Sequence, residues 1–362
     1  MHLIEVLALR PVPAAGLFMG LTRRCPLSCA HCSTNSMLTS EEHPEEPFLR
    51  FVESFRADDR PELLLMSGGE PLLRPDLVGR LARSARSVGC RSLLLSGMFF
   101  ARSGRAIPKP IKRAIDELDH FSASLDVFHE REVARSEVFR VLRQLLDEGK
   151  DVSLQVVGLG ASDPYLAEIT EDVRRTLNDR VPILVGSVGP IGRAASWLKL
   201  EAQAGPAQPD VDPCTLAAWP LVSYDGTIVA CCNQHVADGR AAPHLRLGHA
   251  ATDEWPAIRA RLLTSPMLRA IRTFGPEYLA DRHGSGVVSC DGYCSTCMKL
   301  QLDPELEARV ADLFERPGMK VVEAEVREMQ IRAGALSYAR RFGISRYADL
   351  VALGATEVAE AR

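Results

Sequence analysis

The sequence has no apolar run near the ~18 residues that a membrane-spanning helix requires. Its start, MHLIEVLALRPVPAAG, carries an acid and lacks the basic segment that precedes the apolar stretch of a secretory signal. Lys and Arg total 43 against 47 Asp and Glu, with both signs interspersed, so nothing indicates a nucleic-acid or polybasic membrane surface. We therefore expect a cytoplasmic protein that binds neither nucleic acid nor membrane.

No disordered or fibrous class fits a composition that is 46% hydrophobic and 25% charged. The 362 residues are enough for about two domains, or for one α/β barrel with a smaller appendage. No internal repeat of roughly 20 to 50 residues is found beyond an alternation of strand-like and helix-like segments.

The ten cysteines are the most informative residues. Cys90 stands alone, and we expect it to be a buried small hydrophobe. Clustered thiols in a large cytosolic protein more often hold metal than form disulfides. The other thiols fall into three groups: Cys25, Cys29 and Cys32; Cys214, Cys231 and Cys232; and Cys290, Cys294 and Cys297.

Short apolar runs alternate with longer amphipathic stretches between residues 17 and 188. The alternation is typical of βα units around a parallel sheet, and right-handed crossovers would curl six units into a partial (β/α)6 TIM-like barrel with an open side for a substrate. The expected strands are 17–22, 62–67, 92–97, 120–126, 151–158 and 181–188. The expected helices are 43–56, 75–88, 108–118, 130–148 and 165–178.

The pattern changes beyond about residue 195, where Pro, Gly and Cys become frequent. The segment PLVSYDGTIVACC predicts a β-hairpin, because Asp225-Gly226 is a strong turn dipeptide between β-rich arms. The last stretch has helical spacing and no cysteine, which predicts two or three helices. We therefore divide the chain into a barrel, 1–194, a Cys-rich domain, 195–302, and a helical extension, 303–362.

The first cysteine group lies in CPLSCAHC, directly after the first expected strand. That position is the C-terminal mouth of the barrel, where barrel active sites lie. Three thiolates suit an iron–sulfur cluster with one position left open, or zinc if His31 supplies a fourth ligand. His31 is badly placed for that purpose between two closely spaced ligands, so the spacing favours a cluster.

This C-x3-C-x2-C pattern resembles the signature of the radical S-adenosylmethionine (SAM) enzymes. The second expected strand ends in Ser67-Gly68-Gly69-Glu70-Pro71, similar to the family's GGE motif, although alone such a segment would be only a turn. Ser124 and Asp126 end the fourth strand and resemble the family's S-x-D motif. The resemblance covers residues 17 to about 190.

The resemblance implies that Cys25, Cys29 and Cys32 bind a [4Fe–4S] cluster whose free iron chelates SAM. Electron transfer from a low-potential donor such as flavodoxin or ferredoxin would then cleave SAM to a 5′-deoxyadenosyl radical. The GGE backbone and carboxylate would hold the SAM ammonium group, and the polar groups of S-x-D would lie near the ribose. No catalytic residue is assigned.

Two further polar residues carry weaker expectations. Gln155 would point into the barrel toward the adenosine, or would be satisfied by a neighbouring backbone group. His129 would face the substrate, or would simply belong to the first turn of the next helix, which we favour.

The later cysteines resemble the auxiliary-cluster extension of radical SAM enzymes, called SPASM or, in its one-cluster form, twitch. No cysteine follows Cys297, so the resemblance implies one auxiliary [4Fe–4S] cluster rather than two. Zinc bound by the same residues is the alternative, and the roles of Cys232 and Cys290 stay open. The implied ligands are Cys214, Cys231, Cys294 and Cys297.

Taken together, the expected function is that of a radical SAM oxidoreductase or maturase that modifies a ribosomally synthesised peptide by crosslinking, oxidation or epimerisation. The auxiliary cluster would accept the remaining electron. Only 24 residues precede Cys25, which weakens the peptide prediction because many peptide-modifying relatives carry a leader-binding module there. The alternatives are an enzyme for a small-molecule natural-product intermediate, such as an aminocyclitol, nucleoside or sugar, and, less favoured, a non-catalytic metal-binding module.

Overall fold

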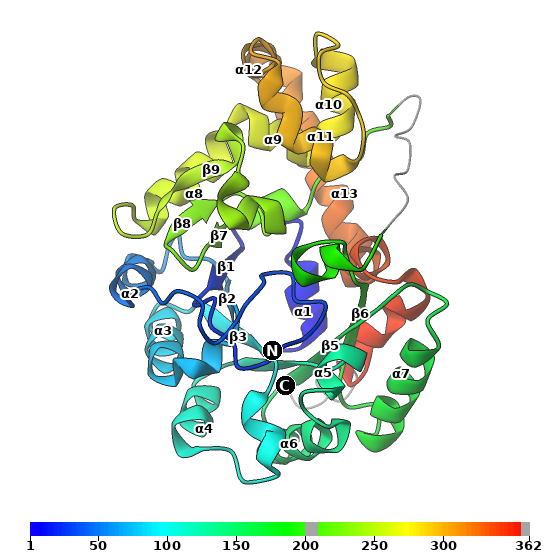
Figure 1. Cartoon of the computed structure of the whole chain (residues 1–362). Coiled ribbons are helices and arrows are strands. Elements are labelled where there is room, and N and C mark those ends of the chain that lie inside the picture. Colours follow the sequence, from blue (N-terminus) through cyan, green and yellow to red (C-terminus); the bar gives the residue numbers. More distant parts are fainter. Residues whose placement is uncertain (200–208, 356–362) are drawn as a thin grey trace.

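The computed structural model describes residues 1–199 and 209–355, and its central feature is one nine-stranded sheet (Figure 1). The strand order is β6-β5-β4-β3-β2-β1-β7-β8-β9. The strands are β1 Gly16–Gly20, β2 Leu63–Ser67, β3 Arg91–Ser96, β4 His120–Ser124, β5 Val152–Gly158, β6 Ile183–Ser187, β7 Leu221–Val222, β8 Thr227–Val229 and β9 Arg246–His249.

Strands β1 to β6 pair in parallel with their sequence neighbours, which confirms the predicted βα repeat. Each observed strand lies within two residues of its predicted bounds. β6 and β9 are the edges of the sheet within the described residues, so the barrel is partial and not closed. The carboxyl ends of all six parallel strands consequently meet at one mouth.

The barrel helices wrap the outside of the parallel strands (Figure 1). The predicted helix 130–148 begins only at Arg135, and a short separate helix, Val127–Glu130, precedes it. The Asp126 carboxylate caps that short helix and accepts hydrogen bonds from the backbone N–H groups of Phe128 and His129. The helices of this part are α1 Leu3–Ala8, α2 Glu46–Glu53, α3 Pro75–Ser87, α4 Lys109–Asp116, α5 Val127–Glu130, α6 Arg135–Asp147 and α7 Pro164–Thr176.

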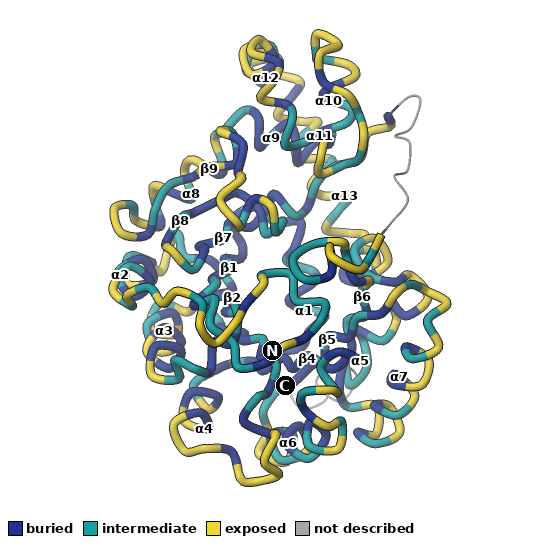
Figure 2. Tube along the Cα trace, viewed as in Figure 1, coloured by how far each residue is buried: buried dark blue, intermediate teal, exposed yellow. Residues whose placement is uncertain are grey.

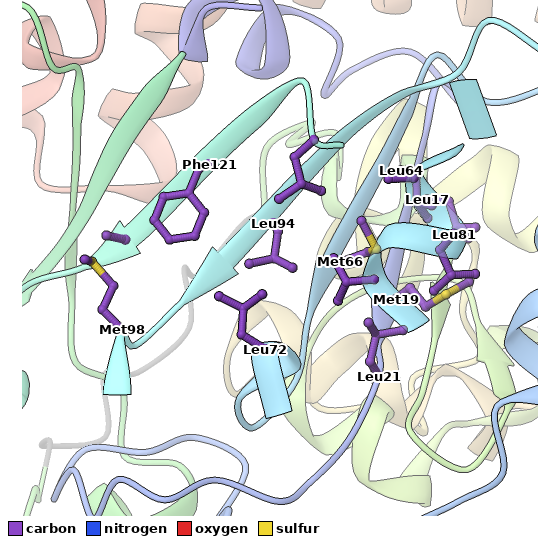
Figure 3. Packing of buried hydrophobic residues seen from close by; sticks show 14 of the residues in the cluster. Leu17, Met19, Leu21, Leu64, Met66, Leu72, Leu81, Leu94, Met98 and Phe121 are labelled. Atoms are coloured by element: carbon purple, nitrogen blue, oxygen red, sulfur yellow. The ribbon is translucent and has the colours of Figure 1, made fainter. Parts of the chain in front are cut away.

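The main core lies between the strands and these helices, and the strands are the most deeply buried part of the chain (Figure 2). Burial of strand residues on both faces explains their continuous apolar character. Cys90 is 1% exposed within this core, as expected of a small hydrophobe. Figure 3 shows side chains from successive strands meeting there, among them Leu17, Met19, Leu64, Met66, Leu94 and Phe121.

The predicted hairpin is present and extends the same sheet. β7 and β8 are antiparallel around a turn in which Gly226 has a φ of 90°. β7 also pairs in parallel with β1, so the Cys-rich region is joined to the barrel at the strand that precedes the first cysteine group. The turn of the hairpin therefore lies at the same end of the sheet as the first cysteine group, and β8 runs back toward the other end.

The remaining helices follow the hairpin, and α9 to α12 gather away from the barrel (Figure 1). α13 runs back toward the barrel with a break at Gly334, whose φ is 71°, and the following short helical segment, Ser345–Ala352, packs against β6. These helices are α8 Trp255–Thr264, α9 Pro266–Phe274, α10 Pro276–His283, α11 Tyr293–Lys299, α12 Leu306–Glu315 and α13 Pro317–Phe342.

The three-domain division stays a prediction, and residues 200–208 and 356–362 of the predicted domains lie outside the described residues. A search of the described residues finds no helix both long and apolar enough to cross a membrane.

Candidate functional site

A cavity of about 330 Å³ opens at the mouth of the barrel. Every parallel strand contributes to its wall through its carboxyl end or the loop that follows. It combines thiols, backbone amides and polar side chains in one enclosed space, as expected of a cofactor site. Its lining includes Cys25, Cys29, Cys32, Ser67, Gly68, Gly69, Gly97, Ser124, Asp126, Gln155, Ser187 and Arg193.

The first thiol group, Cys25, Cys29 and Cys32, lies on the loop after β1 and faces this cavity. Arg193 holds the loop in place, a role that the sequence analysis missed. Its guanidinium donates to the carbonyl oxygens of Cys29 and Ser36, each at 2.8 Å, and its backbone N–H donates to the carbonyl of Cys32 at 2.9 Å. The only sequence signal is its position just after the sixth strand.

The surroundings of the thiols differ within the group. Burial raises the pKa of Cys25 to about 12. Burial also acts to raise the pKa of Cys32, but hydrogen bonds with Thr34 and Ser36 and the charge of Arg193 outweigh it and lower that pKa. The loop therefore favours a thiolate at Cys32, the form that binds metal.

The glycines of the Ser67–Pro71 segment lie against the backbone that leads to the thiols. Gly68 has a φ of 139°, and an added Cβ there would stand 2.5 Å from the carbonyl oxygen of Thr22. A Cβ on Gly69 would stand 2.4 Å from the carbonyl oxygen of Arg24. Only glycine permits this approach, which also places both residues in the cavity wall.

Glu70 occupies a different position from its two neighbours. Its side chain is fully buried, and the carboxylate accepts hydrogen bonds from the backbone N–H groups of Leu72 and Gly97 and from the Ser96 hydroxyl, at 2.9 to 3.0 Å. Burial raises the pKa of Glu70 to about 7 despite these bonds. The carboxylate thus supports the cavity wall at Gly97 from behind, and a direct contact with a ligand stays a prediction.

Asp126 links two histidines on the side of the cavity formed by β4. Its Oδ2 lies 2.8 Å from Nδ1 of His129 and 3.4 Å from Nε2 of His31. Burial alone would lower the pKa of His129, but the hydrogen bond to Asp126 and the contact with Cys29 raise the pKa of His129 to about 10. The pKa of His31 is instead lowered by burial, to about 4. His129 thus lies beside the thiol loop, while Ser124 and Gln155 line the cavity without joining this cluster.

The residues present fit the cofactors that the resemblance implies. Three soft thiol ligands leave one position open, and the adjoining cavity carries the glycine turn. His31 pairs with Asp126 and stacks on Phe128 at 4.6 Å, an arrangement that does not favour it as a fourth ligand of zinc.

A second set of thiols meets where the hairpin and α11 converge. Cys231 and Cys232 follow β8, and Cys294 and Cys297 share one face of α11 because they are three residues apart. Burial raises the pKa of Cys231, Cys294 and Cys297, and charges of neighbouring thiols raise each further. We call Cys214, Cys231, Cys232, Cys294 and Cys297 the second thiol group.

Cys290 lies apart from this group. Its thiol donates to the carbonyl oxygen of Glu277 at 3.7 Å. Burial raises its pKa, followed by the charges of Glu277, Asp281 and Asp291, with no contribution from another cysteine. Cys290 thus stands among carboxylates at the edge of an apolar cluster that Cys214 and Cys297 also contact.

A second cavity of about 190 Å³ adjoins the first. Cys232, Arg23, Tyr224 and Gln234 are among its lining residues. Arg23 stacks on the Tyr224 ring with its guanidinium carbon 5.1 Å from the centroid. The two cavities share Ser33, Thr34, Ser67 and Gly68, so the second cavity connects the first one to the second thiol group.

Comparison with known proteins agrees with this geometry. Residues 19–181 match the profile of the Radical SAM superfamily. The PqqA peptide cyclase of Granulibacter bethesdensis is 28% identical over 156 residues, which are 40% of each chain. The PqqA peptide cyclase of Gluconobacter oxydans is 34% identical over 117 residues, 32% of this chain and 31% of that relative. The chain thus spans less than half the length of these relatives.

A solved structure shows the same fold over a longer stretch. It is Streptococcus suis SuiB bound to precursor peptide SuiA, with a TM-score of 0.51 and 11% identity. The superposition covers 76% of this chain and 71% of SuiB. It reaches well beyond residues 19–181, so the likeness includes part of the chain outside the barrel.

Proposed function

We propose, because residues 19–181 match the profile of the Radical SAM superfamily, that this chain is an enzyme that reductively cleaves SAM and abstracts a hydrogen atom from a substrate. The observation that carries the proposal is the single cavity in which the three thiols of the first group face the Gly68-Gly69 turn. A [4Fe–4S] cluster and SAM bound there would supply a 5′-deoxyadenosyl radical. The protein's own part is to bind, orient and enclose these groups.

Individual residues support that task in different ways. Cys25, Cys29 and Cys32 would hold the cluster, and Gly68 and Gly69 would present backbone polar groups to the amino acid portion of SAM. Ser124 and Gln155 line the wall on which the nucleoside portion would lie. Both carboxylate oxygens of Asp126 already accept hydrogen bonds, so its contribution is to fix His129 and His31.

The proposed substrate is a ribosomally synthesised peptide. Support comes from relatives named as peptide cyclases and from a structure with the same fold that is bound to its precursor peptide. Crosslinking, oxidation and epimerisation are the outcomes open to a radical formed on a peptide, which makes the enzyme an oxidoreductase or maturase.

An auxiliary [4Fe–4S] cluster at Cys214, Cys231, Cys294 and Cys297 completes the proposal. It would accept the electron left on the substrate in an oxidation, and the second cavity leads in its direction. Cys232 faces the second cavity, and Cys290 stands among carboxylates. We therefore leave both out of the four proposed ligands of the auxiliary cluster. The partner that reduces the enzyme would be a low-potential protein such as flavodoxin or ferredoxin.

The test is anaerobic reconstitution with iron and sulfide, followed by incubation with SAM, reductant and peptides encoded beside the gene. We expect 5′-deoxyadenosine and a change in one peptide, seen as a mass shift for crosslinking or oxidation and as deuterium uptake in D2O for epimerisation, with a Cys29→Ala variant as the inactive control. The enzyme could instead form 5′-deoxyadenosine, leave every peptide unchanged and convert an aminocyclitol, nucleoside or sugar. That result would reject the proposed peptide substrate and retain the radical chemistry. Zinc without iron in anaerobically purified protein would reject both.

A further inference from the structure

Arg10 is a buried cation that pairs with no carboxylate among the described residues. It is 2% exposed, and the polar group that its guanidinium meets is the side chain of Tyr338. The guanidinium carbon instead stands 4.4 Å from the Trp219 ring centroid, 4.8 Å from that of Phe18 and 5.4 Å from that of Tyr338. Rings attract the cation but do not replace hydrogen bonds to an anion, so burial of Arg10 is costly as it stands.

Arg272 is a second buried cation, 8% exposed, on α9. Within the part of the chain that the structure describes, its guanidinium donates one hydrogen bond, to the carbonyl oxygen of Ala217 at 3.3 Å. Burial lowers the pKa of Arg272 to about 10, which still leaves it charged at neutral pH. The nearby carboxylate of Glu323 is bound at 2.7 Å by Arg269, so it is already balanced by another cation.

Both cations lie beside the second thiol group. Arg272 and Cys214 line one small cavity together with Pro11, the residue that follows Arg10. The ring of Tyr338 faces Arg10. Burial raises the pKa of Tyr338, and the nearby charges of Cys232 and Cys214 raise it further, so this ring lies close to both thiols.

The third arginine near these thiols is already neutralised. Arg341 acts electrostatically on Cys214 but pairs with Asp212 at 2.7 Å. Arg327 also lines the small cavity, but its side chain is exposed to solvent. The buried positive charge of the region therefore comes from Arg10 and Arg272.

We propose that Arg10 and Arg272 form a buried positive lining that binds an anionic auxiliary cluster at the second thiol group and raises its reduction potential. This inference rests on the proposed auxiliary cluster and adds a cause for its role as an acceptor. A cluster bound by four thiolates is an anion that gains a further negative charge on reduction. Fixed positive charge in a poorly solvated site stabilises the reduced form more than the oxidised one.

The test measures the potential of the auxiliary cluster alone. Cys25, Cys29 and Cys32 are changed together to Ala in the full chain, which gives the parent protein of the test. The reconstituted protein is poised at a series of potentials, and the signal of the reduced cluster is measured at each by electron paramagnetic resonance. Arg10→Met and Arg272→Met should each lower the ratio of reduced to oxidised cluster at fixed potential by about tenfold, or ~59 mV for one electron. Arg10→Lys, which keeps the charge, should stay within threefold of the parent.

Arg60→Met is the control, because Arg60 pairs with Glu62 and lies against Gly89 beside β3, whereas the hairpin of the second thiol group lies on the other side of β2 and β1. Potentials of both Met variants equal to that of Arg60→Met would overturn the inference. If Arg10→Met loses its iron while Arg10→Lys retains it, the requirement for charge is supported. If both Arg10 variants lose their iron, the potential of Arg272→Met tests the inference by itself. A parent that binds no iron at the intact second group would instead reject the auxiliary cluster itself.

Discussion

The two thiol groups present the same side chain in opposite settings. The first group lies on a loop facing an open cavity of about 330 Å³, where a ligand can reach an incompletely bound metal. The second group is gathered from a hairpin, α11 and the segment before β7, next to buried arginines. The first setting suits chemistry on a bound small molecule, and the second suits a closed centre that only exchanges electrons.

The comparison teaches that ligand count is only part of a metal site. Three thiols beside a glycine turn leave room for a cofactor, whereas four or five thiols drawn from distant segments would surround a metal. What separates the two roles is access and charge, and the following experiments would break or sharpen that separation.

The largest expected effect is a separation of the two clusters by mutation. Changing Cys25, Cys29 and Cys32 together to Ala should abolish 5′-deoxyadenosine formation and reduce iron from about eight to about four per chain, since each thiol group would hold four irons. Iron content and product analysis after anaerobic reconstitution check this. Retention of all the iron would mean that the loop after β1 is not a cluster site.

Removing the second centre should affect the product rather than SAM cleavage. Cys294→Ala with Cys297→Ala should preserve 5′-deoxyadenosine and abolish an oxidised product, because the substrate electron then has no acceptor. Cys290→Ala is the matched control and should behave like wild type, since Cys290 interacts with carboxylates. Circular dichroism must show that the double variant is folded. Product formed by a folded double variant at the wild-type rate would make this cluster structural.

Arg193→Ala should loosen the first thiol group. The variant loses hydrogen bonds to the carbonyl oxygens of Cys29 and Ser36, each worth about 1.5–3 kcal/mol for a charged donor. We expect faster loss of iron to a chelator from the first group, with the second unchanged. Arg193→Lys keeps the positive charge but not the several N–H donors of the guanidinium, so it should lose iron at an intermediate rate. If both variants lost iron at the wild-type rate, Arg193 would have no role in holding the first thiol group.

Glu70→Gln should weaken SAM binding by about tenfold to a hundredfold, the equivalent of roughly 1.5–3 kcal/mol. The carboxylate of Glu70 accepts hydrogen bonds from three donors at once. A glutamine amide would offer only one accepting oxygen, and its NH2 group would face a hydrogen-bond donor of the protein. Binding would be measured by equilibrium dialysis under anaerobic conditions. Glu62→Gln, at the other end of β2, is the control, and equal affinities would reduce the Ser67–Pro71 segment to a turn.

The smallest effect concerns thiol reactivity in iron-free protein. Iodoacetamide at pH 7.5 should alkylate Cys32 faster than Cys231 or Cys297, because the pKa of Cys32 is lowered and theirs are raised. Only the thiolate reacts, so a higher pKa slows the reaction at fixed pH. Peptide mass spectrometry on protein of unchanged circular dichroism reports each site, and the reverse order would contradict the stated environments.

The sequence by itself determined the local parts of this protein. Apolar runs such as ELLLMS and SLLLSG identify strands because strands buried on both faces need apolar side chains throughout. C-x3-C-x2-C and Ser67–Pro71 each concentrate their chemistry within a few residues, so both were visible without coordinates. Asp225-Gly226 located the hairpin for the same reason.

Only the tertiary structure decided how those parts meet. Arg193 reaches the loop of Cys29 from beyond the sixth strand, and Glu70 turns its carboxylate behind the wall rather than into the cavity. Arg272 shares a small cavity with Cys214, and Arg10 lies against Tyr338, whose pKa responds to the charge of Cys214, although these residues are far apart in the chain. Such contacts depend on strand order and helix packing rather than on spacing along the sequence, so no local pattern encodes them, and they set the access and charge that distinguish the two thiol groups.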